Sequence, residues 1–174
     1  MNKRSEKPMY QPNTSFLMKH PAHIFALGFG SGLLPKAPGT FGTLMAFPLF
    51  WLIAGFSIPI KLGIIAVLFV IGIYFCNQTS EALGVSDHGG IVWDEIVGML
   101  LVLTFTPPHW FFWLVAFVLF RLFDIWKPFP IRQFDRKLKN GFGVMFDDVL
   151  AAIFACICMF ALIVWLIGPH QLPF

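Results

Sequence analysis

Long apolar runs, separated by short polar segments, dominate the chain after residue 20. Runs of about 20 apolar residues are long enough to cross a bilayer as helices. We expect spans over residues 41–57, 60–76, 91–106, 109–126 and 148–167. Pro48 should kink the first of these, and Pro107–Pro108 should turn the chain tightly between the third and the fourth. The pattern predicts an all-α integral membrane protein, a compact bundle of about five transmembrane helices.

The N-terminal region has a different pattern. Residues 1–20 are polar, basic and contain two prolines, which predicts a flexible cytoplasmic tail. The apolar stretch that follows is interrupted by Gly28, Gly30 and Gly32 and is too short to span. We therefore expect an N-terminal interfacial or re-entrant segment packed against protein. Residues 21–174 are expected to form a single transmembrane domain.

Composition supports the membrane assignment. The chain is 57% hydrophobic and only 12% charged, with a mean hydropathy of +0.77. A chain of 174 residues cannot bury this much apolar surface in one water-soluble core. The 22 Phe and six Trp suit a protein in contact with lipid and with the bilayer interfaces. The expected partners are membrane lipids, and no nucleic acid is expected.

Basic residues orient the predicted bundle. Lys and Arg gather before the first span and between the fourth and the fifth, whereas Lys61 alone lies in an expected outer loop. Because cytoplasmic loops carry the excess of Lys and Arg, the N-terminus and the 124–147 loop are expected in the cytoplasm.

Carboxylates are the main candidates for chemistry. An acidic pair at the head of an apolar helix costs free energy and marks an ion or substrate site by default. In the predicted topology, acidic residues from three spans converge on the cytoplasmic side: Asp94, Glu95, Asp124, Asp147 and Asp148. Oxygen ligands gathered in this way suit Mg²⁺.

Some of these acids also have simpler interpretations. Asp147 is equally consistent with a helix N-cap, and Asp148 with a favourable interaction with the helix dipole. Asp124 follows Arg121 by three residues, the spacing of an ordinary helical ion pair. Asp94 and Glu95 point about 100° apart on a helix, so both can face one site only at its edge.

A second group of candidates is basic or hydroxylic. Lys36 and Thr40 lie in a Pro-Lys-Ala-Pro-Gly-Thr stretch that leads into the first span. Free N–H groups at a helix start, with a lysine and hydroxyls, suit a phosphate, although Pro-Gly-Thr is also a common cap. Lys127 and Arg132 lie close enough to the acids in sequence to neutralise a phosphate. Arg136, Lys137 and Lys139, on an amphipathic 131–139 segment, are expected to fix topology.

Four sequence blocks resemble one known family. They are Lys36-Ala-Pro-Gly-Thr-Phe-Gly-Thr43, Ile91-Val-Trp-Asp-Glu-Ile-Val-Gly98, Phe120-Arg-Leu-Phe-Asp-Ile-Trp-Lys-Pro-Phe-Pro130 and Gly141-Phe-Gly-Val-Met-Phe-Asp-Asp148. In this order they are similar to the blocks of the phosphatidylglycerophosphatase A family. The resemblance covers nearly everything after residue 20.

The resemblance implies a magnesium-dependent enzyme of the bacterial inner membrane. Such an enzyme removes the terminal phosphate of phosphatidylglycerophosphate and yields phosphatidylglycerol. By motif match, the five acids would form the site, with the phosphate-side groups Lys36, Thr40, Arg121 and Lys127. The chain has Gly90 where many members carry an acid, which leaves the 87–90 loop and His88 without an assigned role.

Two other classes of function remain open from the sequence. Intramembrane carboxylates also mark cation or proton pathways, so a transporter is the main alternative. The acids gather at one boundary rather than at mid-membrane, and no paired inverted repeats are evident, which disfavours that alternative. A non-catalytic scaffold would leave the converging carboxylates unexplained.

Overall fold

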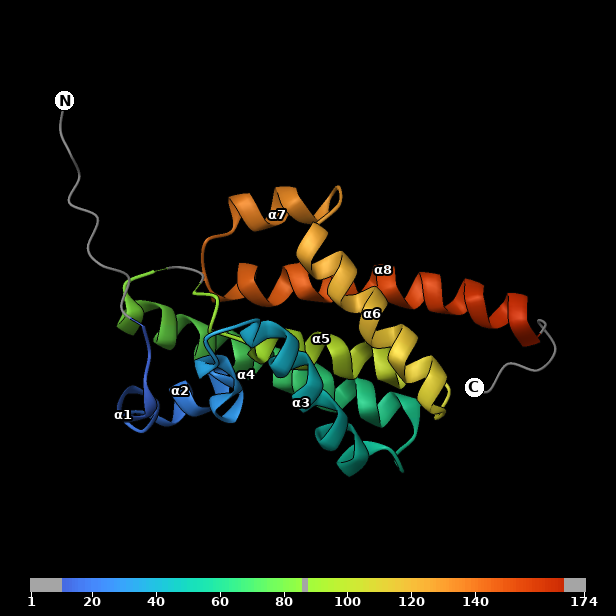
Figure 1. Cartoon of the computed structure of the whole chain (residues 1–174), viewed down its shortest axis with the longest axis horizontal. Helices are drawn as coiled ribbons and strands as arrows, with labels where there is room; N and C mark the ends of the chain where they lie inside the picture. The colour runs from blue at the N-terminus through green and yellow to red at the C-terminus, as the bar shows by residue number, and fades with distance from the viewer. Residues whose placement is uncertain (1–10, 86–87, 168–174) are drawn as a thin grey trace.

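A computed structural model describes residues 11–85 and 88–167, and within this part of the chain every regular element is helical (Figure 1). The predicted all-α class is therefore confirmed for the described residues. The elements are α1 (Thr14–Leu17), α2 (Pro21–Ala26), the 3₁₀ helix η1 (Gly28–Leu33), α3 (Pro38–Ile53), α4 (Ile58–Leu83), α5 (Trp93–Thr104), α6 (Trp110–Trp126), α7 (Ile131–Lys137) and α8 (Gly141–Ile167).

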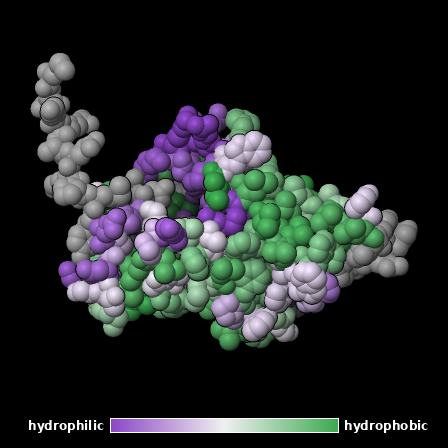
Figure 2. Space-filling view, in the orientation of Figure 1, coloured by the Kyte–Doolittle hydropathy of each residue, from purple (hydrophilic) through white to green (hydrophobic). Residues whose placement is uncertain are grey.

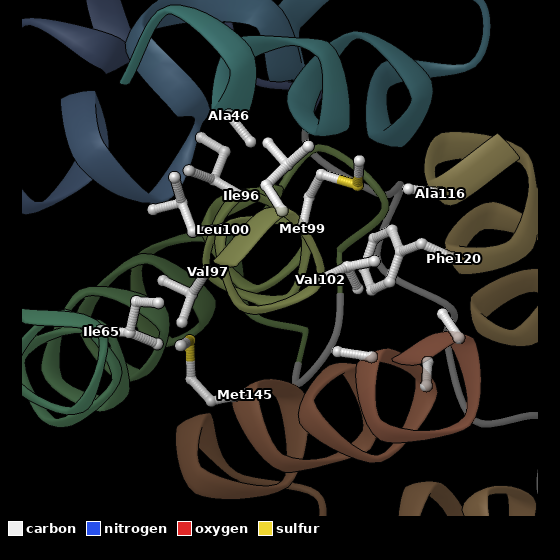
Figure 3. Close-up of a cluster of buried hydrophobic side chains, with 14 of the residues drawn as sticks. Ala46, Ile65, Ile96, Val97, Met99, Leu100, Val102, Ala116, Phe120 and Met145 are labelled. Atoms are coloured by element: carbon white, nitrogen blue, oxygen red, sulfur yellow. The ribbon is translucent and has the colours of Figure 1, made fainter. Parts of the chain in front are cut away.

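The short helix α5 lies at the centre of the bundle, with α3, α4, α6 and α8 around it (Figure 3). Ten of its twelve residues are buried. Its apolar side chains point outward on every side, toward Ala46 of α3, Ile65 of α4, Phe120 of α6 and Met145 of α8. A helix that is apolar all round is stable only inside a protein or a bilayer, and α5 is enclosed by protein.

Gly98 brings three helices together at the middle of α5. A Cβ atom at this position would lie 2.7 Å from the ring of Phe120 on α6 and 3.2 Å from the carbonyl oxygen of Asp148 on α8. Only glycine permits this approach without displacing a neighbour. The close contact sets α5 against α6 and α8 one turn beyond the acidic pair Asp94–Glu95.

Two helices are long and apolar enough to cross a bilayer, α4 and the Gly141–Leu166 part of α8. The best 18-residue windows of these helices are only 11% and 28% buried, so most of their apolar side chains face outward. At about 1.5 Å per residue, α5 is roughly 18 Å long and does not reach the length of a full span. The predicted number of about five transmembrane helices is not settled by this arrangement and stays a prediction.

The N-terminal elements pack beside α4. Residues 1–10 of the predicted tail lie outside the described residues, but its last part is folded, because α1 buries Phe16 and Leu17. The ring of His23 on α2 stacks on Phe16 and hydrogen-bonds through Nδ1 to the hydroxyl of Thr79 on α4, at 3.0 Å. The glycine-rich stretch forms η1, a short non-spanning element that adjoins α3.

Gly98 and Gly63 offer a matched test of this packing. Ala at position 98 should lower the free energy of unfolding by about 1–3 kcal/mol, because its methyl group overpacks the contact with Phe120. Ala at position 63 of α4, where a Cβ would meet no atom within 4 Å, should raise it by up to about 1 kcal/mol through helix propensity. Unfolding in detergent, followed by tryptophan fluorescence, measures both changes. Equal effects of the two substitutions would contradict the packing at Gly98.

Candidate active site

Three helices present carboxylates to one end of the bundle. Asp94 and Glu95 occupy the first turn of α5, Asp124 lies in the last turn of α6, and Asp147 and Asp148 lie inside α8. Four of them are buried, and the Glu95 side chain retains 12% of its exposure. The structure therefore brings together the five acids that the sequence analysis identified. They come from three helices that are far apart in the chain.

Asp94, Glu95 and Asp148 form a group that could hold a metal ion. One carboxylate oxygen from each lies within 4.8 Å of the other two. Glu95 Oε2 and Asp148 Oδ2 are buried and accept no hydrogen bond from the described residues. Buried carboxylate oxygens without donors are costly unless a cation compensates them. The donor set, all oxygen and all anionic, fits a hard divalent cation.

Arg121 of α6 is the cation on one side of this group. Its Nη1 atom lies 2.5 Å from Asp124 and 3.5 Å from Glu95 Oε1, so it joins α6 to α5. The same nitrogen lies 3.4 Å from the hydroxyl of Thr43, which in turn donates to the carbonyl oxygen of Gly39 at 2.8 Å. The helical ion pair between Arg121 and Asp124 is present, but it is one part of a network across three helices.

The start of α3 lies directly against the site. A Cβ atom at Gly39 would lie 2.2 Å from Glu95 Oε1 and 3.0 Å from Arg121 Nη2, so this position requires glycine. Of the two predicted phosphate-side groups here, Thr40 is partly buried in the first turn of α3 and Lys36 is exposed just before it. Neither makes an ion pair or a side-chain hydrogen bond with the acids in the described structure. Thr43, rather than Thr40, makes the contact with Arg121.

Lys127 is the second cation of the site, and it lies on the other side of the carboxylates from Arg121. It ends α6 in a left-handed conformation with φ of 46°, which is strained for a residue with a side chain. Its ammonium group binds Asp147 of α8 and, at 2.9 Å, Asp135 of α7. Burial lowers the pKa of Lys127, but the charges and hydrogen bonds of Asp147 and Asp135 outweigh it and raise this pKa above its ordinary value. Through these two ion pairs, Lys127 ties together α6, α7 and α8.

Two simpler interpretations can now be corrected. Asp147 does not cap α8, because α8 begins at Gly141 and the side chain of Asn140 accepts the hydrogen bond from the N–H of Gly143, at 2.9 Å. Asp148 likewise lies beyond the first turn of α8, so it does not act at the end of the helix dipole. Both acids are presented from the body of α8 toward α5 and α6.

The 88–90 loop is held by local contacts. The N–H of Gly90 donates to His88 Nδ1 at 3.0 Å, and a Cβ at Gly90 would lie 2.7 Å from the carbonyl oxygen of Gly32 in η1. A side chain at position 90 would displace this neighbour. His88 has a structural contact here, and the loop packs against η1.

Asp135 is the residue of this region that the sequence reasoning missed. It lies eight positions after Lys127, across the turn that joins α6 to α7, and no helical spacing relates the two. Arg132 was predicted to neutralise a phosphate beside the acids. It lies on the exposed side of α7, where it lines a surface hollow together with Lys127.

Fold and site together define a class: an all-helical protein with a buried, metal-capable carboxylate centre flanked by an arginine and a lysine. The family model for Phosphatidylglycerophosphatase A matches residues 24–163, and the chain belongs to this family. The resemblance seen in the four sequence blocks, and with it the prediction of a phosphatase, is confirmed.

Two relatives with curated names agree with this assignment. The chain is 49% identical over 158 residues to a Haemophilus influenzae protein named Phosphatidylglycerophosphatase A, covering 90% of this chain and 97% of that protein. It is 46% identical over 160 residues to the Escherichia coli K12 protein of the same name, covering 88% of this chain and 87% of that one. No solved structure matches the chain.

Lys127 and Asp147 allow a test of the ion pair that joins α6 to α8. Met in place of Lys127 should lower the free energy of unfolding by about 3 kcal/mol, because it leaves a buried carboxylate without its cation. In the Lys127 variant, a second substitution of Asp147 by Asn should restore most of the lost stability. A double-mutant cycle in detergent measures this coupling. Met in place of the exposed Lys137 is the control and should change stability by less than about 0.5 kcal/mol. Additive effects of the two substitutions would show that the pair is not coupled.

Proposed function

We propose that this protein is a Mg²⁺-dependent phosphomonoester hydrolase that removes the terminal phosphate of phosphatidylglycerophosphate and yields phosphatidylglycerol for phospholipid biosynthesis. The observation that carries the proposal is the juxtaposition of the Asp94, Glu95 and Asp148 oxygens with the guanidinium of Arg121. A phosphomonoester needs both parts, anionic ligands for a metal ion and cations for its own charge. The named relatives point to the same substrate.

Asp94, Glu95 and Asp148 would hold the ion. When bound, Mg²⁺ would supply charge neutralisation for the phosphoryl group and Lewis acidity that favours attack by water. Asp124 and Asp147 lie outside this group of three and bind Arg121 and Lys127, so they would orient these two cations toward the phosphate, and one of the five carboxylates would accept the proton of the attacking water. In this division of roles, each of the five acids has a task that depends on its charge.

The cations would bind and orient the phosphate. Arg121 presents a planar fork of N–H donors that matches phosphate oxygens, and Lys127 offers a point charge from the opposite side. The first turn of α3 abuts Arg121 at Gly39 and brings Thr40 and Lys36 to the same place, although the N–H of Thr40 already donates to the carbonyl oxygen of Ala37 at 3.0 Å. The reacting phosphate would then sit between the start of α3 and the ends of α5 and α6.

We further propose that the chain is an integral protein of the bacterial inner membrane and crosses it several times. Support comes from α4 and α8, whose long apolar surfaces face outward and would otherwise be exposed to water. The carboxylate site lies at the end of the bundle that also holds Lys127 and the basic helix α7. By the positive-inside rule this end faces the cytoplasm, which would place the active site there.

A cation- or proton-coupled transporter was the alternative for the same carboxylate cluster. It is not favoured, because the chain belongs to a family named for a phosphatase. The acids also gather where the start of α5 and the end of α6 meet the N-terminal part of α8, and the rest of α5 is mainly apolar. A pathway across the bundle would need polar groups along that core.

The proposed reaction can be tested by phosphate release from phosphatidylglycerophosphate in mixed micelles, with Mg²⁺ and with excess chelator. Asn in place of Asp94 should lower kcat by at least about a hundredfold, because it removes one anionic ligand, and chelation should abolish release by the unmodified protein. The variant should fold normally, since it relieves repulsion among buried carboxylates. Gln in place of Glu81, an exposed acid near the end of α4, is the matched control and should retain full activity.

One result would contradict the proposed reaction, and another would contradict only the role of Asp94. If the folded, unmodified protein released no phosphate from phosphatidylglycerophosphate, the proposed reaction would be contradicted. Near-normal turnover by the Asp94→Asn variant would remove Asp94 from the site while leaving the reaction standing.

Metal binding has a readout that does not depend on activity. Mg²⁺ at about 100 times its dissociation constant should stabilise the folded protein by about 2.7 kcal/mol, because only the folded chain brings the three ligands together. Thermal unfolding in detergent at rising Mg²⁺ measures this effect. Asn in place of Asp148 should abolish the shift, while Glu81→Gln should keep it. A shift of the same size in the Asp148 variant would place the ion elsewhere.

A further inference from the structure

A hollow of about 620 Å³ opens beside the active site, between the end of α6 and α7. Its walls are Ile125, Trp126, Lys127, Arg132, Asp135 and Arg136. A second hollow of about 380 Å³ shares four of these residues and adds the α6–α7 turn with Phe129. Figure 2 shows hydrophilic residues gathered over α7, whereas the surface over the far half of α8 is mainly apolar.

The charge of this hollow is positive and uncompensated. Its single acid, Asp135, is already bound by Lys127 at 2.9 Å and lies 3.9 Å from Lys139. Arg132 and Arg136 form no ion pair in the part of the chain that the structure describes. They are four residues apart on one helix face, where two like charges repel each other. An anion placed between them would remove this repulsion and satisfy both guanidinium groups.

Lys127 connects the hollow to the carboxylate site. Its ammonium group binds Asp147 within the site, and the same residue lines the hollow. An elongated ligand that occupies both places must therefore pass Lys127. The substrate proposed above has this form, because a glycerol unit separates its terminal phosphomonoester from the phosphodiester that joins it to the diacylglycerol.

We propose that Arg132 and Arg136 bind the phosphodiester of the lipid substrate while the phosphomonoester lies at the carboxylates. This inference rests on the proposed function and gives it a source of specificity for headgroups with two phosphates. It replaces the sequence-based expectations that Arg132 contacts the reacting phosphate and that Arg136 serves topology alone. Both guanidinium groups become specificity determinants, outside the chemistry of the reacting phosphate.

The apolar rim of the hollow suits a lipid that stays in the membrane. Trp126 and Phe129 are 68% and 75% exposed, and Ile125 beside them is 71% exposed. Large aromatic side chains with one face free are typical of the membrane interface. A phosphodiester held by the two arginines would lie next to these side chains, where the acyl chains leave for the bilayer.

The test compares two constants in mixed micelles of neutral detergent: KM for phosphatidylglycerophosphate, and the inhibition constant of inorganic phosphate. Inorganic phosphate reports only on the place of the reacting phosphate. The Arg136→Gln variant should raise KM about tenfold relative to that inhibition constant, because one charge-assisted contact is lost. Lys137→Gln removes the same charge from α7 at an exposed position that lines neither hollow, and should leave the ratio unchanged.

The possible outcomes separate this inference from the proposed function. No turnover by the unmodified protein would contradict the proposed function. With turnover present, an unchanged ratio in Arg136→Gln would overturn the inference, whether both constants rise together or neither changes. An equal rise of the ratio in Lys137→Gln would also overturn it, because the effect would then be one of surface charge. Arg132→Gln should repeat the result of Arg136→Gln if both guanidinium groups bind one phosphate.

Discussion

The gathering of five carboxylates, four of them buried and Glu95 nearly so, at one end of a helical bundle is the constraint on which this structure depends. Each buried charge costs several kcal/mol, and like charges at close range add to that cost. Arg121 and Lys127 compensate part of it, by binding Asp124 and Glu95 on one side and Asp147 on the other. The oxygens of Glu95 and Asp148 without donors mark what these two cations leave uncompensated. A bound divalent cation would complete the balance, which links the stability of this region to the proposed chemistry.

The fold positions these charges through close helix packing. The central helix α5 carries Asp94 and Glu95 in its first turn, and glycines let neighbouring backbones approach it: Gly98 allows α6 and α8 to come close, and Gly39 places the start of α3 against Glu95. The strained conformation of Lys127 then turns the chain from α6 into α7, where ion pairs to two helices hold it. The same turn creates the basic hollow next to the site, so the proposed contacts with both phosphates depend on one short segment.

Much of the candidate site was readable from the sequence because charge is rare in this chain. An acid inside an apolar run stands out, and the positive-inside rule places the five acids on one side, so their convergence could be expected. The helical class followed from the apolar pattern, and the break between α5 and α6 followed from Pro107–Pro108. The cap of α8 was harder to identify, because Asn140 lies in a polar loop well before the apolar run, and Asp147 has the spacing of a cap. The ion pair between Lys127 and Asp135 could not be predicted from helical spacing, because it forms across the turn between α6 and α7.

The central claim, that Asp94, Glu95 and Asp148 hold one divalent cation, is tested most directly by locating the ion in a crystal. Mn²⁺ can replace Mg²⁺ and is visible by its anomalous scattering. The account predicts one anomalous peak bounded by oxygens of these three residues, at about 2 Å from each ligand atom, and no such peak in an Asp148→Asn variant. A peak bound by other residues, or no peak here at saturating Mn²⁺, would contradict the account.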